Sequence, residues 1–112
     1  MAGYRSESTG LKYKRDPNFT FEMLPRIRSY GHWYIVENQY PYDRVAEVHH
    51  MLVPIRRFSE RGEMEYYESD ELRFILRELA LNEEYDSLIE NFPHERTVPE
   101  HFHLHLIKLL KT

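Results

Sequence analysis

The chain has 112 residues, a formal net charge of −4 at pH 7 and no cysteine. This length predicts one domain with a modest core, and the absence of cysteine excludes disulfides and thiol chemistry. The weakly acidic charge gives no reason to expect a nucleic-acid partner. No stretch approaches the roughly 18 apolar residues of a membrane span, and the N-terminus lacks the apolar run of a signal peptide. We therefore expect a cytoplasmic protein with no membrane partner.

The first elements of the chain are weakly marked. Residues 1–17 are polar, charged and without periodicity, so they are predicted to form a flexible N-terminal arm. Residues 18–112 are then a single domain. Within it, Phe19, Phe21 and Met23 alternate with polar residues, which predicts a short edge strand that Pro25 ends.

Two clearer strands follow. Residues 32–38 are rich in β-branched and aromatic residues and end at a turn over residues 40–43, which is typical of a strand and its reversal. Residues 44–48 are predicted to be a connection. A second strand over residues 49–53 is closed by Pro54.

The central part of the chain predicts one main amphipathic helix. Residues 56–67 are charged and contain Gly62, so they are expected to be a loop. Ser69 is the predicted N-cap of a helix from about residue 70 to residue 82. Four apolar residues recur at i, i+3, i+4 and i+7 and form one face of this helix: Leu72, Ile75, Leu76 and Leu79.

The last third of the chain predicts two more strands. Residues 85–92 form the first, and a loop with two prolines over residues 93–100 leads to the second, at residues 101–107. Strands that flank one amphipathic helix predict an α+β domain, built around an antiparallel sheet of about five strands.

The final strand carries a row of alternating histidines. On a strand, His101, His103 and His105 share one face at a spacing of about 6.6 Å. Packing does not require three titratable rings, so we consider three interpretations. The row is a solvated strand face, a metal site to which His49 adds a ligand, or a site of phosphate chemistry in which a neutral imidazole attacks phosphorus.

Residues 101–107 resemble the His-φ-His-φ-His-φ-φ motif of the histidine triad (HIT) family of nucleotide hydrolases and transferases. Three other segments resemble features of that family in the same order. Residues 38–41 are similar to its Asn/Asp-x-x-Pro, and residues 49–54 are similar to its strand of the form His-x-hydrophobic run-Pro. Asn91 is similar to its strand-end asparagine near the phosphate. The resemblance covers about residues 31–109.

One segment departs from the family pattern. The family usually has Gly-Gln-Ser/Thr-Val directly before the triad, whereas this chain has Arg96-Thr97-Val98 followed by a two-residue spacer. The glycine that allows close approach of the backbone is missing. Arg96 is expected to bring a positive charge to the phosphates, and the alternative is a solvated loop charge.

The resemblance implies an enzyme that acts at the α-phosphate of a nucleoside phosphate derivative through a nucleotidyl-histidine intermediate. It implies that His103 is the nucleophile. His101 and His105 are expected to orient the phosphate oxygens and to help protonate the leaving group, to which Thr97 donates from its hydroxyl.

The resemblance also assigns the surrounding residues. His49 is expected to hydrogen-bond within the triad, although a strand register shifted by one residue would place His50 there. Asn38 is expected to hold the ribose, or else simply ends a strand. Asn91 and Arg96 complete the predicted nucleotide-binding set, and aromatic residues between residues 33 and 42 are expected to wall the base pocket.

A nucleotide-type small molecule is therefore the expected partner, with no cofactor and no metal ion. By resemblance we expect a homodimer. The alternative function is a non-catalytic nucleotide-binding protein, or a histidine-ligated metal-binding protein, on the same HIT-like fold.

Overall fold

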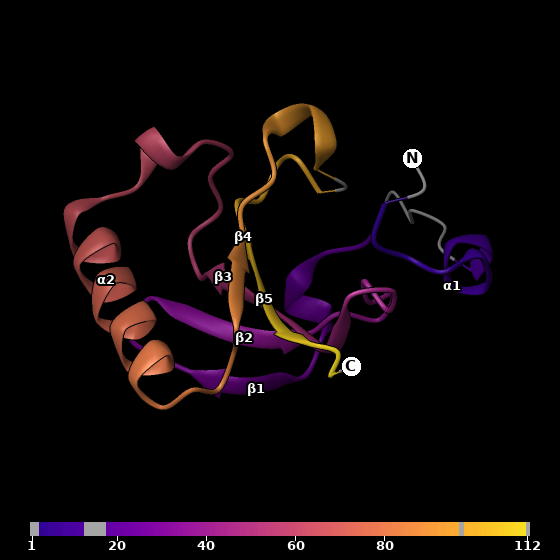
Figure 1. The fold of residues 1–112 in the computed structure, drawn as a ribbon. Coiled ribbons are helices and arrows are strands. Elements are labelled where there is room, and N and C mark those ends of the chain that lie inside the picture. Colours follow the sequence, from indigo (N-terminus) through magenta and orange to yellow (C-terminus); the bar gives the residue numbers. More distant parts are fainter. Residues whose placement is uncertain (1–2, 13–17, 97, 112) are drawn as a thin grey trace.

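The computed structural model describes residues 3–12, 18–96 and 98–111. It has an α+β architecture, with a five-stranded antiparallel sheet and one main helix (Figure 1). This confirms the predicted fold class. In chain order the strands are β1 (Arg26–Ser29), β2 (Trp33–Glu37), β3 (Ala46–Pro54), β4 (Ser87–Ile89) and β5 (Leu104–Leu109).

The last strand of the chain lies inside the sheet. The spatial order is β1-β2-β3-β5-β4, and every neighbouring pair is antiparallel. β5 is therefore paired on both sides, so its backbone groups are satisfied along both edges. Both faces of β5 are also covered, since its first four residues are all buried.

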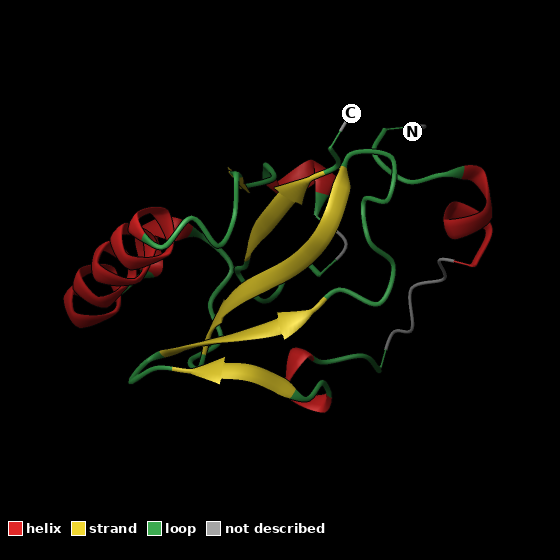
Figure 2. Cartoon of the chain, turned by 60° about the horizontal axis from the view of Figure 1, so that its bottom comes forward, coloured by secondary structure: helices red, strands yellow, loops and turns green. Residues whose placement is uncertain are grey.

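The main helix, α2 (Tyr66–Leu81), covers one face of the sheet, which we call the helix face (Figure 2). Its apolar stripe buries Leu72, Ile75 and Leu79, with Leu76 partly buried beside them. The stripe packs against side chains of β2, β3 and β5 and of two loops: Trp33, Ile35, Leu52, Phe58, Phe102, Leu104 and Leu106. Full burial of each large apolar side chain contributes about 2 kcal/mol, so this layer is the main source of stability.

Among the described residues, no long helix covers the opposite face of the sheet, which we call the histidine face. It is covered by the 3-10 helix η1 (Phe21–Met23) and by the segment before β5. Its apolar cluster comprises Phe21, Tyr34, Val36, Met51, Val53 and Val98. The ring of Phe21 lies 5.3 Å from that of His101 and 4.9 Å from that of His103.

The predicted edge strand at Phe19–Met23 is wrong. Those residues precede and form η1, and the edge strand β1 comes after Pro25. All four residues of β1 are exposed, so β1 carries no alternation of apolar and polar residues for a sequence pattern to detect. Its pairing with β2, not burial, makes it a strand.

The boundaries of other elements also differ from the predictions. β3 begins at Ala46 instead of His49, and β4 spans only Ser87–Ile89. α2 begins at Tyr66, with Glu65 and not Ser69 as its N-cap. The reason is a local capping contact, since the buried carboxylate of Glu68, at position N3, accepts the backbone N–H of Glu65 at 2.8 Å. Tyr66 is mostly exposed, so the first turn of α2 has no apolar signal.

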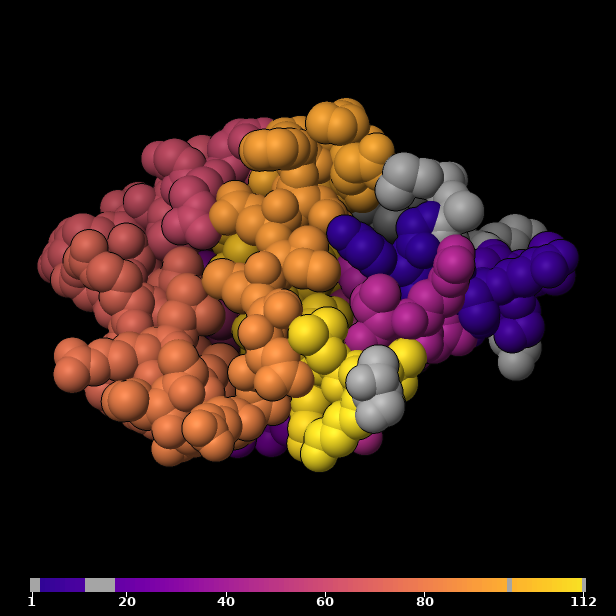
Figure 3. All heavy atoms as spheres, in the orientation of Figure 1, coloured from indigo at the N-terminus to yellow at the C-terminus, as the bar shows by residue number. Residues whose placement is uncertain are grey.

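The described part of the N-terminal segment lies against the loop between β2 and β3 (Figure 3). It contains a short helix, α1 (Glu7–Lys12). The Asp43 carboxylate accepts hydrogen bonds from the Ser6 backbone N–H at 2.6 Å and from the hydroxyls of Ser6 at 2.7 Å and Thr9 at 2.5 Å. No helix in the described part of the chain is both long and apolar enough to cross a membrane.

Candidate active site

The three histidines of the row are buried on the histidine face. His101 and His103 precede β5, and His105 lies within it. Their side chains are only 1%, 4% and 3% exposed, respectively. Phe21 covers the first two rings, and the ring of Tyr42 lies 5.1 Å from that of His105. The interpretation of the row as a solvated strand face is therefore wrong.

The tautomer of His103 follows from one contact. Nδ1 of His103 lies 2.9 Å from the backbone carbonyl oxygen of His101. A carbonyl oxygen only accepts, so Nδ1 carries the proton and Nε2 carries the lone pair. Burial lowers the pKa of His103 to about 4, so the ring is neutral at pH 7. A neutral imidazole with an oriented Nε2 lone pair is a nucleophile.

A chain of hydrogen bonds orients His49 and His105. The backbone N–H of Tyr42 donates to Nδ1 of His49 at 3.0 Å, so Nε2 of His49 carries a proton. That Nε2–H donates to Nδ1 of His105 at 2.8 Å. The remaining proton of His105 is thus on Nε2, which lies 3.5 Å from the Tyr42 hydroxyl and 3.3 Å from the Asn91 amide.

Burial also keeps this second pair of rings neutral. It lowers the pKa of His49 to about 3 and that of His105 well below its ordinary value. The charge of Arg5, whose guanidinium lies 4.9 Å from the ring centroid of Tyr42, acts in the same direction on both. The site therefore holds oriented rings that are neutral at pH 7.

The strand register decides between His49 and His50. His49 pairs with Ile107 and lies diagonally across from His105, which pairs with Met51. His50 points to the helix face, where its Nδ1 lies 2.6 Å from the Tyr85 hydroxyl. The structure therefore places His49, as predicted, beside the triad.

Asn38 follows β2 and serves two purposes. Its Oδ1 accepts the backbone N–H of Tyr40 at 2.8 Å, which shapes the turn that ends the strand. Its Nδ2 lies 3.4 Å from Nε2 of His49, so the amide reaches the edge of the histidine cluster. Asn38 both ends a strand and borders the candidate site.

A hollow of about 670 Å³ opens beside Asn38. This volume is within the range of small-molecule sites. The hollow is lined by two segments, one that runs into the start of β1 and one that runs on from the end of β2. The lining residues are Leu24, Pro25, Arg26, Ile27, Glu37, Asn38, Gln39, Tyr40 and Pro41. No histidine is among these residues, so Asn38 is the link between the hollow and the rings.

Arg96 ties together two loops at the other end of the site. Its Nε donates to the carbonyl of Asn91 at 3.0 Å, and its Nη1 donates to the carbonyl of Ser59 at 2.5 Å. The Nδ2 of Asn91 in turn donates to the Tyr42 hydroxyl at 3.2 Å. Arg96 is therefore not a solvated loop charge, and its charge contributes to the lowered pKa of His103.

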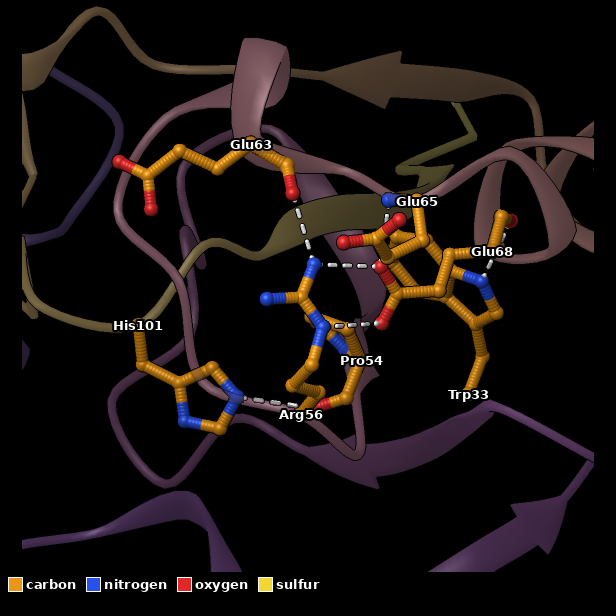
Figure 4. A network of polar contacts seen from close by, with 7 residues as sticks. All are labelled: Trp33, Pro54, Arg56, Glu63, Glu65, Glu68 and His101. Atoms are coloured by element: carbon orange, nitrogen blue, oxygen red, sulfur yellow. Dashed lines mark hydrogen bonds and ion pairs between the residues drawn. The ribbon is translucent and has the colours of Figure 1, made fainter.

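Two predicted residues are not part of the described cluster. Thr97 falls outside the described residues. Trp33 lies on the helix face, fully buried, and its indole N–H donates to the carbonyl of Glu68 at 2.9 Å (Figure 4). The prediction that Trp33 walls a base pocket beside the histidines is wrong, because successive residues of β2 point to opposite faces.

The same network anchors the chain after β3 (Figure 4). Arg56 donates to both carboxylate oxygens of Glu68, at 2.7 and 3.1 Å, and to the carbonyl of Glu63 at 2.7 Å. Two residues before Arg56, the carbonyl of Pro54 accepts a hydrogen bond from Nε2 of His101 at 2.8 Å. The ring of His101 is thus hydrogen-bonded to the last residue of β3, two residues before the arginine that pairs with Glu68.

Several residues of this site have no local signal in the sequence. Phe21 and Tyr42 contact the histidine rings, and Glu22 lies 3.9 Å from His101. All three come from segments distant in sequence from the triad, and only the order of the strands brings them there. Tyr42 follows Pro41 in a segment predicted as an ordinary turn.

Within the described residues, no three histidine or carboxylate side chains are placed to hold a metal ion together. Comparison with known proteins adds no assignment, because no protein-family model matches this sequence and no curated protein matches it.

Proposed function

We propose that this chain is a HIT-type nucleotide hydrolase or nucleotidyl transferase, with His103 as its nucleophile. The observation that carries the proposal is the contact between Nδ1 of His103 and the carbonyl of His101. It places the proton of a buried, neutral ring on the nitrogen that faces the backbone, so the lone pair of Nε2 is available for attack. The resemblance of residues 101–107 to the HIT motif supplies the reaction class.

The proposed reaction has two displacements at the α-phosphorus. Nε2 of His103 attacks, a phosphorus–nitrogen bond forms, and the bond to the leaving group breaks as that group takes up a proton from solvent. Water or another acceptor then attacks the nucleotidyl-histidine and releases a proton to solvent, the phosphorus–nitrogen bond breaks, and His103 is regenerated. With water the product is a nucleoside monophosphate.

His105 is the proposed hydrogen-bond donor to the phosphate. Its Nδ1 is occupied by His49, so its proton is held on Nε2. A preorganised N–H in a buried site stabilises the charge that develops on the phosphate oxygens. His49 acts through His105, because it sets the tautomer that makes this donor.

The nucleoside is proposed to occupy the hollow beside Asn38. The amide of Asn38 would hold the ribose hydroxyls, with the base lying among Leu24, Ile27 and Tyr40. Nδ2 of Asn91 lies 3.3 Å from Nε2 of His105, and Arg96 donates to the carbonyl of Asn91. Asn91 and Arg96 would bind the phosphate, and the hydroxyl of Thr97 would donate to the leaving group. We also propose a homodimeric, cytoplasmic enzyme, and light scattering of the purified protein tests the dimer.

The alternative is a nucleotide-binding or metal-binding protein that does not turn over. The hydrogen bonds support the enzyme over a metal site. Ring nitrogens of His49, His101 and His103 form hydrogen bonds to separate partners, which are backbone groups and the His105 ring, and do not converge on one point.

A substrate panel tests the proposal. Nucleoside phosphoramidates and dinucleoside polyphosphates are screened for release of AMP or GMP, by the wild type and by the variant His103→Asn. The asparagine amide can still donate to the His101 carbonyl but has no nucleophilic lone pair, so we expect turnover to fall by at least about a thousandfold while nucleotide binding is retained.

Exposed His94, replaced by Asn, is the matched control and should turn over normally. After acid quenching, a substrate labelled at the α-phosphate should leave label on the wild type and none on His103→Asn. Hydrolysis by His103→Asn at the wild-type rate would show that His103 is not the nucleophile. Binding without turnover by the wild type would establish the non-catalytic alternative.

A further inference from the structure

Two buried polar side-chain atoms lack a hydrogen-bond partner among the described residues: the Tyr34 hydroxyl and Nδ1 of His101. Buried polar groups in proteins are nearly always paired, so each exception calls for an explanation. Both atoms belong to the histidine face, and both feel the negative charge of the same residue, Glu22.

The surroundings of His101 suit a ring with two protons. Its Nε2 lies 2.8 Å from the Pro54 carbonyl, an acceptor, and therefore carries a proton (Figure 4). Its Nδ1 then has a lone pair, yet it faces the carboxylate of Glu22, another acceptor, at 3.9 Å. A proton added to Nδ1 would replace the repulsion between lone pair and carboxylate by an ion pair.

Glu22 is held in this position. Arg57 donates from Nη2 to Oε1 of Glu22 at 2.7 Å, while Oε2 is the atom that faces His101. Burial would raise the pKa of Glu22, but hydrogen bonds from its own backbone and from Arg57 outweigh burial and lower it. Glu22 is therefore charged at pH 7. Its neighbour Phe21 packs on the ring of His101 and fixes η1 over it.

Opposing influences act on His101, and their net effect is a lowered pKa. Burial is the strongest influence and lowers its pKa, and Arg57 acts in the same direction. The Pro54 carbonyl, Glu22 and Glu100 act in the opposite direction. The His103 ring is a further neighbour of His101, and it is neutral at pH 7. An anion bound at His103 would add negative charge beside His101, and this favours the protonated ring.

We propose that Glu22 is a positioning residue that lets His101 take up a proton when an anionic phosphate binds. The protonated ring, held between the Pro54 carbonyl and Glu22, then supplies positive charge next to the reacting phosphate. The proton comes from solvent, and it returns to solvent when the product leaves. This inference rests on the proposed function for the identity of the anion, but the coupling between Glu22 and His101 is a property of the free protein.

The coupling is tested without any nucleotide. The imidazole nitrogens of His101 are followed by NMR during a pH titration of wild type, Glu22→Gln and the control Glu47→Gln, whose carboxylate pairs with Lys108 instead. We expect the midpoint of His101 to move to lower pH in Glu22→Gln and to stay in place in Glu47→Gln. An unchanged or higher midpoint in Glu22→Gln would overturn the proposal.

The role in binding is tested with AMP as the probe. Calorimetry in two buffers of different ionisation enthalpy should show net proton uptake by the wild type at neutral pH. Glu22→Gln should lose this uptake and bind AMP roughly tenfold more weakly. Equal proton uptake by both proteins would overturn the role of Glu22. Failure of the wild type to bind any nucleotide would refute the proposed function and the phosphate-linked role, whereas the titration of the free protein would still report on the coupling itself.

Discussion

Nε2 of His49 donates to Nδ1 of His105 across 2.8 Å, and this contact sets the tautomer of His105. The donor is defined because Nδ1 of His49 already accepts the backbone N–H of Tyr42. The result is a directed chain that starts at a backbone amide and ends at Nε2–H of His105. The position of the proton on Nε2 of His105 is thereby fixed by uncharged groups alone.

The energetic coupling of this pair is the first prediction. We expect His49→Ala and His105→Ala each to lower the free energy of unfolding, and the double variant to lose about 1 kcal/mol less than the sum, because either single change leaves a buried nitrogen unpaired. Urea denaturation of the four proteins measures the coupling. His50→Ala combined with His105→Ala is the control and should be additive, since His50 lies on the other face. If the losses in the free energy of unfolding caused by His49→Ala and His105→Ala were additive, the hydrogen bond between the two rings would be contradicted.

The second prediction concerns acid. In the folded protein burial lowers the pKa of His49 to about 3 and that of His103 to about 4. An unfolded histidine has a pKa of about 6.5, so below that pH the unfolded chain binds the protons first. Stability is therefore complete above about pH 6.5 and declines as the pH falls toward 4, by up to about 1.4 kcal/mol per pH unit for each histidine.

Urea midpoints between pH 8 and pH 5 measure this loss, which begins above the range where carboxylates titrate. His103→Asn removes one of the groups and should give a shallower dependence on pH than the wild type. A stability that is constant between pH 7 and pH 5 would show that these rings are not buried in their neutral forms.

Arg96 gives the third prediction. Its fork-shaped guanidinium joins the carbonyls of Asn91 and Ser59, a geometry that a lysine ammonium does not reproduce. We expect Arg96→Lys, which keeps the charge, to lose about 1 kcal/mol of stability and to make the loop over residues 92–100 more sensitive to proteases. If the charge alone matters, Arg96→Lys should behave as the wild type and only Arg96→Met should be impaired.

The fourth prediction uses the end of α2. Glu83 has a φ of 55°, in the left-handed region that disfavours residues with a Cβ atom. Glycine has no such penalty at the position that follows a helix. Glu83→Gly should therefore raise the free energy of unfolding by about 1 kcal/mol. Glu78→Gly, inside the helix, is the control and should lower it by about 1 kcal/mol. A loss of stability in Glu83→Gly would contradict the assigned backbone conformation.

Part of the candidate site was predictable because it depends on local geometry. In the extended chain of residues 101–107, alternate side chains point to opposite faces, so the pattern alone groups His101, His103 and His105 on one face and Phe102, Leu104 and Leu106 on the other. The hydrophobic core confirms the second group. In the same way, the periodicity of α2 identified its buried stripe.

The tertiary structure alone decided what covers the histidines and which nitrogen of each ring carries the proton. A period of two residues shows neither that β5 lies inside the sheet nor that both of its faces are covered. Tyr42 and Glu22 reach the rings from segments at least 59 residues away in sequence. Their contacts depend on strand order and loop paths, which arise from the whole chain, whereas the alternation of side chains arises from each residue's own backbone.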